Sequence, residues 1–335
     1  MNFIIDMKAK ASAALKRLVL PEGTDKRIVR AARIILDERL ASSVALLGKA
    51  ADIQEAARTE GVDLGGIDII SPASDPRLSK YADIYYELRK NKGITHEQAR
   101  IDIADNLRWG AMMIRQNDAD AIVAGCERTT SDVLRAGLSI IGTTPGLKTA
   151  SSCFVMTGLD PQYGVDGAMI FSDCAVVPNP TADQLADIAQ SASMSCREFL
   201  NAEPITALLS FSTKGSAAHD DVVKVQTAVD ILKEKKVDFI FDGELQADSA
   251  LVPAVLEAKA AGSPLLSGKR TVNTLIFPDL DAGNIGYKLV QRLGKAQAFG
   301  PFLQGFSKPI SDLSRGASVD DIVTTCAVTL ARVKN

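Results

Sequence analysis

Short apolar segments alternate with longer amphipathic ones along most of the chain. The segments RLVLPEG at 17–23 and AIVAG at 121–125 each indicate a buried strand that leads into a loop. Between them, Ile28 and Ile35 stand at the spacing of one helix face within residues 24–40. Because apolar strands separated by helices are typical of parallel sheets covered on both faces, the pattern predicts an α/β fold with mainly parallel sheets.

The last apolar stripe of the chain begins at a clear helix-start signal. Ser318 is followed three residues later by Asp321, which is the spacing of a capping box. The apolar positions after it share one helix face: Val319, Ile322, Val323, Cys326, Leu330 and Val333. Capping is the ordinary interpretation of Ser318 and Asp321 on spacing alone. Ser314 and Arg315 stand just before, so a hydroxyl, a guanidinium and a carboxylate lie within residues 314–321.

Length, composition and charge narrow the class of protein. The 335 residues, 46% of them hydrophobic, are enough for two packed domains. The segment 140–152 is rich in turn residues and is the best candidate for a crossover between the domains. The net charge of −3 argues against nucleic acid or an anionic membrane as the main partner.

Cysteine usage and the absence of long apolar runs suggest a compartment. The five cysteines are scattered and form no CxxC pair, which argues against a disulfide framework or a thiolate zinc site. The N-terminus has no apolar signal region, and no run approaches the roughly 20 apolar residues of a membrane span. We expect a soluble, cytoplasmic protein.

Several common catalytic signatures are missing from the sequence. Neither His96 nor His219 has a histidine or cysteine partner at metal-ligand spacing, so no metal site is expected. There is no GxGxxG for a dinucleotide and no GxSxG nucleophile elbow. The remaining candidate chemistry is that of arginines and hydroxyls in loops.

Those arginines and hydroxyls suit a phosphate group. Arg135, Thr130 and Ser131 lie in one segment that follows a predicted strand, and Arg89 lies in another segment. Together with Arg315 they could form a phosphate clamp, because a guanidinium pairs with two phosphate oxygens at once. For any single arginine, a solvated or salt-bridged surface position is the more common outcome.

Five segments in order carry a resemblance to a known family: YELRKNKG, TTSDVLRAGLSII, FSDCAVVPNPTADQLADIA, FDGELQADSALVP and SRGASVDD. Over essentially the whole chain, the sequence resembles the short form of the phosphate acetyltransferases (phosphotransacetylases), within the phosphate acetyl/butyryltransferase family. The resemblance implies reversible transfer of an acetyl group between CoA and inorganic phosphate. CoA is then a substrate, and no permanently bound cofactor is expected.

The resemblance also implies an architecture. It is that of isocitrate and isopropylmalate dehydrogenases, with two α/β/α domains and a cleft between them. Residues 1–148 plus 297–335 would form domain I with the C-terminal helix, and residues 149–296 would form an inserted domain II. The expected assembly is a homodimer. The expected partners are therefore small-molecule substrates and a second copy of the chain.

Residue by residue, the resemblance assigns catalytic roles to Asp321, Ser314 and Arg315, with Arg135 and Arg89 at the phosphate. A thiol has a pKa of about 8.5 and an ordinary aspartate about 3.9, so proton transfer to Asp321 is uphill by about 4–5 units. Desolvation would reduce that gap. We therefore expect Asp321 to face the cleft, partly desolvated and near Ser314.

Three other interpretations remain open at this point. A phosphate butyryltransferase would share the fold and the chemistry with a longer acyl group. An NAD(P)- and metal-dependent hydroxyacid dehydrogenase would share the architecture, and Asp242, Glu244 and Asp248 are its only faint metal candidates. A catalytically inactive binding or regulatory domain is the third, against which the joint presence of Ser314, Arg315 and Asp321 speaks.

Overall fold

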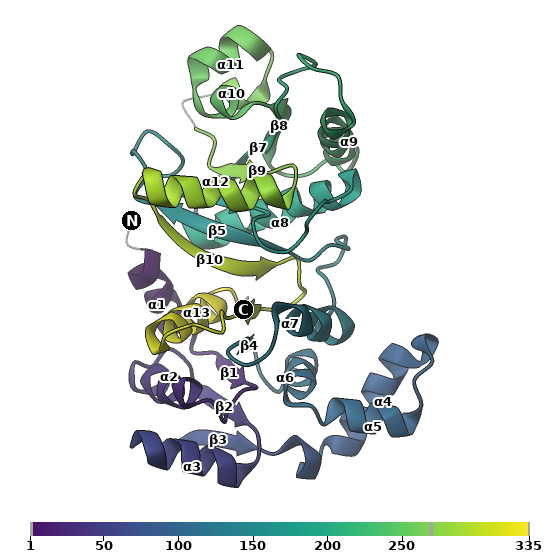
Figure 1. The fold of residues 1–335 in the computed structure, drawn as a ribbon, viewed down its shortest axis with the longest axis vertical. Helices are drawn as coiled ribbons and strands as arrows, with labels where there is room; N and C mark the ends of the chain where they lie inside the picture. The colour runs from purple at the N-terminus through teal and green to yellow at the C-terminus, as the bar shows by residue number, and fades with distance from the viewer. Residues whose placement is uncertain (1–2, 268–270, 334–335) are drawn as a thin grey trace. The chain divides into compact units, whose positions relative to one another are not determined.

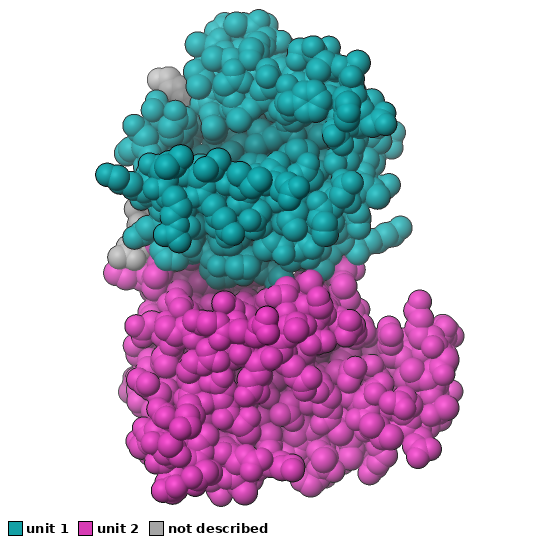
Figure 2. All heavy atoms as spheres, in the orientation of Figure 1, with its two compact units in different colours: residues 1, 146–305 teal, residues 2–145, 306–335 magenta. Residues whose placement is uncertain are grey.

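The structure is a computed structural model that describes residues 3–267 and 271–333. These residues form two compact units (Figure 2). The inserted unit comprises residues 146–305. The terminal unit comprises the chain up to residue 145 and from residue 306 onward. The first crossing between the units lies within the turn-rich segment 140–152.

The terminal unit is built on a five-stranded parallel sheet in the order β11-β4-β1-β2-β3. Its strands are β1 (Arg17–Leu20), β2 (Ser43–Leu47), β3 (Ile67–Ile70), β4 (Ala121–Ala124) and β11 (Ile310–Asp312). Its helices are α1 (Phe3–Ala14), α2 (Lys26–Asp37), α3 (Ala50–Glu60), α4 (Leu78–Arg89), α5 (His96–Ile103), α6 (Asn106–Arg115), α7 (Thr130–Ala136) and α13 (Val319–Ala331).

Helix α13 closes one face of this sheet. Its predicted apolar stripe is buried at Ile322, Val323, Cys326 and Leu330, where it packs against α1, α2 and β4. The first and last helices of the chain are thus neighbours in one hydrophobic core. The predicted face of this helix is confirmed, because its 3.6-residue period matches a single packing surface.

Helices α4 and α5 form a hairpin that extends away from the sheet (Figure 1). The first half of α4 is fixed to α6, where the rings of Tyr81 and Trp109 lie 4.5 Å apart between centroids. Arg89 is the last residue of α4 and lies in its other half.

The inserted unit carries a six-stranded sheet in the order β10-β5-β6-β9-β7-β8. Its strands are β5 (Ser151–Thr157), β6 (Met169–Ser172), β7 (Ile205–Leu209), β8 (Ile240–Leu245), β9 (Thr274–Ile276) and β10 (Gln297–Gln304). Its helices are α8 (Ala182–Leu200), α9 (Asp220–Glu234), α10 (Ala247–Leu251), α11 (Pro253–Ala260) and α12 (Leu280–Leu293). Strands β6, β9, β7 and β8 are parallel, and β5 is antiparallel to both of its neighbours.

The second crossing between the units differs from the predicted one. The sequence placed residues 297–335 in the first domain, whereas the structure returns the chain to the terminal unit at residue 306. The reason is β10, which pairs with the whole of β5 and so belongs to the sheet of the inserted unit. A strand that covers an open sheet edge in this way satisfies backbone groups that would otherwise be exposed.

No helix among the described residues is both long enough and apolar enough to cross a membrane.

Candidate active site

The strand order of the terminal unit reverses between β1 and β4. The chain proceeds from β1 outward to β2 and β3 and then returns to β4 on the other side of β1. In open α/β sheets, ligands bind beyond the carboxyl ends of the strands at such a reversal. The loops at this edge are residues 21–25 after β1, 125–129 after β4 and 313–318 after β11.

A buried carboxylate organises the loop after β4. Glu22, only 4% exposed, accepts hydrogen bonds from four consecutive backbone amides. Its Oε2 lies 2.9 and 2.8 Å from the amides of residues 125 and 126, and its Oε1 lies 2.9 and 2.8 Å from those of residues 127 and 128. These amides therefore bind an internal anion and are not offered to a ligand. The sequence reasoning missed Glu22, and its only signal was a glutamate directly after a buried strand.

The loops after β4 and β11 touch at Gly125. This residue has φ +125°, and a Cβ there would lie 2.5 Å from both Asp312 Oδ1 and the carbonyl oxygen of Leu313. Only glycine allows such a close approach with that backbone conformation. The contact brings the end of β11 against the loop that Glu22 holds.

Thr130 is joined to the end of β11 by a short hydrogen bond. Its Oγ1 donates to Asp312 Oδ2 over 2.5 Å. Burial raises the pKa of Asp312 to about 6, the Thr130 bond lowers it, and the charge of Glu22 raises it. The other oxygen, Asp312 Oδ1, is buried and has no hydrogen-bond partner among the residues that the structure describes. Sequence reasoning singled out Thr130 but missed Asp312.

Ser314 and Arg315 lie on the surface immediately after β11. The Ser314 Oγ accepts a hydrogen bond of 3.2 Å from the amide of Gly316, which fixes the turn. The Arg315 side chain is exposed, and its guanidinium makes no hydrogen bond or ion pair within residues 3–267 and 271–333. This guanidinium is therefore available to an external anion.

Arg27, which was not predicted from the sequence, holds the backbone of residues 315–317 by hydrogen bonds from its side chain. Its Nη1 donates to the carbonyl oxygens of Arg315 at 2.8 Å and Ala317 at 3.0 Å. Its Nη2 donates to the carbonyl oxygen of Cys126 at 3.3 Å and pairs with Asp25 at 2.6 Å. The loops after β1, β4 and β11 are thus tied together by one side chain.

The predicted capping box at the start of α13 is confirmed. The Ser318 amide donates to Asp321 Oδ2 at 2.9 Å, and the Asp321 amide donates to Ser318 Oγ at 3.2 Å. The Asp321 side chain is exposed, so the residues of its own unit do not supply the desolvation that we expected. Its Oδ1 has no hydrogen-bond partner in the described part of the chain.

The two remaining arginines are placed differently. Arg135 lies on α7, on the same short helix as Thr130 and Ser131, and its Nη1 pairs with Asp132 at 3.1 Å on the surface. Arg89 lies in the α4–α5 hairpin, and no contact among the described residues connects it to Ser314. The structure therefore gathers Ser314, Arg315 and Asp321 on one segment, joins Thr130 to that segment through Asp312, and leaves Arg89 apart.

Comparison with known proteins places this site in a family. The family described as phosphate acetyl/butaryl transferase matches residues 2–330. The phosphate acetyltransferase of Treponema pallidum is 56% identical over 335 residues, which cover 99% of each chain. The chain belongs to the phosphate acetyl/butyryltransferase family. A solved phosphotransacetylase from Streptococcus pyogenes, a member with 36% identity, superposes with a TM-score of 0.90 over 99% of this chain and 98% of its own.

A more distant likeness concerns the fold alone. The 4-hydroxythreonine-4-phosphate dehydrogenase of Klebsiella pneumoniae is 12% identical, with a TM-score of 0.52 over 95% of this chain and 99% of its own. The expected fold class, an α/β architecture with two mainly parallel sheets shared with dehydrogenases, is confirmed.

The three carboxylates that the sequence offered as faint metal candidates bond to protein groups in the structure. Asp242 pairs with Lys214, Asp248 pairs with Lys259 at 2.9 Å, and Glu244 accepts a backbone amide at 2.6 Å. Across residues 3–267 and 271–333, no group of three or more His, Cys, Asp or Glu side chains could hold a metal ion.

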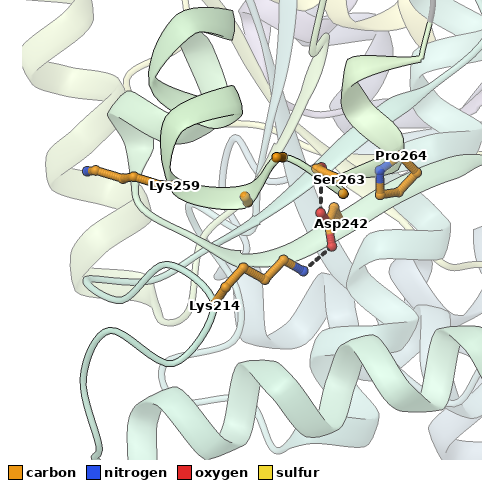
Figure 3. Close-up of a pocket in the computed structure, with 8 residues that line it drawn as sticks. Lys214, Asp242, Lys259, Ser263 and Pro264 are labelled. Carbon is orange, nitrogen blue, oxygen red and sulfur yellow. Dashed lines mark hydrogen bonds and ion pairs between the residues drawn. The ribbon is translucent and has the colours of Figure 1, made fainter.

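A pocket of about 340 Å³ in the inserted unit is lined by Lys214, Asp242, Lys259 and Ser263 (Figure 3). The Lys214 ammonium and the Ser263 hydroxyl both bond to Asp242, so the pocket's inner charges neutralise one another. Lys259 extends away from them toward its own carboxylate partner, Asp248. Among the described residues that line the pocket, both lysines are therefore paired with a carboxylate.

Proposed function

We propose that this chain catalyses reversible transfer of an acetyl group between CoA and inorganic phosphate. The observation that carries the proposal is the full-length 56% identity to a phosphate acetyltransferase. The segment 314–321 supports it, because Ser314 and Arg315 stand exposed just before α13 and Asp321 stands exposed in the first turn of that helix. CoA and acetyl phosphate are then substrates, and the chemistry assigned to these groups requires no permanently bound cofactor.

In the direction of acetyl-CoA formation, the reaction is base-assisted attack of the CoA thiol on acetyl phosphate. We assign the base to Asp321, whose Oδ1 is not used by the capping box. As the thiol proton passes to Asp321, a carbon–sulfur bond forms at the acetyl carbon and the carbon–oxygen bond to phosphate breaks. Concerted proton loss and attack avoids a free thiolate, which suits a base much weaker than the thiolate.

Ser314 and Arg315 act on the other charges of the reaction. The Ser314 hydroxyl donates to the oxyanion that develops on the acetyl oxygen. The Arg315 guanidinium holds the phosphate, both as substrate and as leaving group. Arg135, Arg89, Thr130 and Ser131 complete the proposed phosphate site.

The test is the release of free thiol from acetyl-CoA, measured with and without inorganic phosphate. Phosphate-dependent release supports acetyl transfer, and its absence from well-folded protein contradicts the proposal. The second candidate is phosphate butyryltransfer, which the family's description includes. The ratio of kcat/KM for acetyl-CoA and butyryl-CoA decides between them, because each methylene contributes about 1–3 kcal/mol in a pocket. A nicotinamide absorbance assay with Mg²⁺ tests the dehydrogenase alternative.

Arg135→Ala is expected to raise KM for acetyl phosphate by roughly 10–100-fold with a much smaller change in kcat. The variant loses a hydrogen bond to a charged group, worth about 1.5–3 kcal/mol. Steady-state kinetics measure the effect. Arg100→Ala, at an exposed arginine on α5, is the control and is expected to behave as the wild type. An unchanged KM in Arg135→Ala removes this residue from the phosphate site.

We also propose that the chain forms a homodimer through α12. Ile285, Leu289 and Leu293 stand four residues apart on this helix and are 56%, 52% and 79% exposed. The opposite side of α12 packs on the sheet, where the rings of Tyr287 and Phe154 stack at 4.1 Å. An apolar stripe on both sides of a helix indicates two packing partners. A two-fold axis would place the same stripe from each copy at one interface.

Leu289→Asp is expected to convert the dimer to a monomer in sedimentation experiments, because it places a charge within the apolar stripe. Val223→Asp, at a residue 54% exposed on α9, is the matched control and is expected to leave the mass unchanged. A wild-type monomer, or a dimer that Leu289→Asp leaves intact, contradicts this interface.

We assign the protein to the reducing environment of the cytoplasm. The five cysteines all lie within the described residues, where they are buried and form no disulfide. Cysteines that form no disulfide are typical of proteins in reducing compartments.

A further inference from the structure

The hydroxyl of Thr130 has a single proton, and the structure shows where that proton goes. Thr130 Oγ1 donates to Asp312 Oδ2, because an ionised carboxylate can only accept. The 2.5 Å separation is that of a hydrogen bond to a charged oxygen. While Asp312 is ionised, Thr130 therefore offers lone pairs, not a proton, to anything bound at the surface.

Asp312 is poorly stabilised as an anion. Its Oδ1 is buried without a hydrogen-bond partner in the described residues, and the nearby Leu313 amide donates to the carbonyl oxygen of Ala124. Burial raises the pKa of this carboxyl to about 6, so a modest change in its surroundings protonates it near neutral pH.

The other charged groups around Asp312 do not supply the missing donor. They come from the loop after β1, α2, the loop after β4, α7, the loop after β11 and the start of α13: Glu22, Asp25, Arg27, Glu127, Arg128, Asp132, Arg135, Arg315, Asp320 and Asp321. Arg27, Arg128 and Arg135 are each paired with an acidic side chain other than Asp312. Thr130 is therefore the main hydrogen-bond donor to this carboxylate.

Glu22 is the contrasting neighbour. Four amide donors hold its charge, whereas Asp312 has a single hydroxyl. A carboxylate with few donors in a buried setting is poorly stabilised as an anion. Asp312, and not Glu22, is therefore the carboxylate of this region that lacks donors.

We propose that Asp312 is a positioning residue that takes up one proton from solvent when the phosphate group of the substrate binds, and thereby frees the Thr130 hydroxyl to donate to that group. The inference rests on the proposed function, because it places the phosphate group beside Thr130. Protonated Asp312 donates from Oδ2 to Thr130 Oγ1, which reverses the existing hydrogen bond. The Thr130 proton then points outward to a phosphate oxygen, and one proton has been added in total.

The test uses sulfate, which has the shape and charge of phosphate but does not titrate between pH 5 and 9. Its dissociation constant is measured by calorimetry without substrates. In the wild type, the constant is expected to rise by up to about tenfold per pH unit above pH 6, because binding requires a proton. Asp312→Asn, which is always neutral, is expected to bind with little pH dependence in this range.

Two further variants separate this effect from a structural one. Thr130→Val, which lacks the hydroxyl, is expected to bind sulfate weakly at every pH. Asp320→Asn, at an exposed acid on α13, is expected to keep the wild-type slope. The inference is overturned if the dissociation constant of sulfate changes with pH in the same way for the wild type and Asp312→Asn. It is also overturned if the constant of the wild type does not change with pH.

A measurement on the wild type alone covers the case in which Asp312→Asn does not fold. Sulfate binding at pH 7 in two buffers of different ionisation heat gives the number of protons taken up. A value approaching one supports the inference, and a value of zero overturns it. Thiol release from acetyl-CoA is measured separately. If acetyl transfer fails while sulfate binding still takes up a proton, the proposed function is wrong but the coupling of anion binding to protonation of Asp312 stands.

Discussion

Asp321→Asn lowers kcat by roughly 10²–10⁴ and leaves the fold intact, if Asp321 is the base. The asparagine oxygen still accepts the Ser318 amide bond of the capping box, so the start of α13 is retained. What the variant loses is the ability to take the thiol proton. Stopped assays of thiol release with saturating phosphate give kcat, and thermal unfolding gives the stability.

Ser318→Ala is the matched control for that result. It removes the hydroxyl that caps α13 and is expected to cost about 0.5–2 kcal/mol of stability. Its kcat is expected to remain within a few-fold of the wild type. If Asp321→Asn also turns over within a few-fold of the wild type, Asp321 is only a helix cap and the base must be sought elsewhere.

Glu22→Gln is expected to lower the free energy of unfolding by about 3–5 kcal/mol. The carboxylate accepts from four amides, and the glutamine would turn an NH₂ group toward two of them. Urea unfolding at pH 7 measures the loss. Because the same loop contacts β11 at Gly125, acetyl transfer is expected to fall as well.

The control for Glu22→Gln is Glu38→Gln, at a glutamate that pairs with Lys8 on the surface. Such an exposed pair contributes little, so this variant is expected to unfold as the wild type does. If the free energy of unfolding of Glu22→Gln falls by less than about 1 kcal/mol, the four amides find other acceptors, such as water, and the predicted role of the carboxylate is wrong.

The parts of the fold that the sequence predicted are those that local interactions determine. The apolar period of α13 and its capping box depend on residues within a few positions of one another, and both are confirmed. The edge strand β10 was missed because its partner β5 lies far away in the sequence. Its pairing is not visible in any local pattern.

The same distinction holds for the candidate site. Ser314, Arg315 and Asp321 are close in sequence, so one segment was enough to single them out. Glu22 bonds to amides more than 100 positions away, and Arg27 reaches carbonyls still farther along the chain. An isolated glutamate or arginine gives no sign of such partners. The groups that support the proposed catalytic segment therefore became visible only in three dimensions.

The placement of β11 and α13 has a consequence for synthesis on the ribosome. The inserted unit, residues 146–305, is complete before the last strand and helix of the terminal unit have been made. Domains generally fold as units once they emerge, so the later-finished unit closes last. Arg27 donates to the carbonyl oxygens of Arg315 and Ala317, so the segment that carries Ser314 and Arg315 gains this support only after both units have otherwise been made.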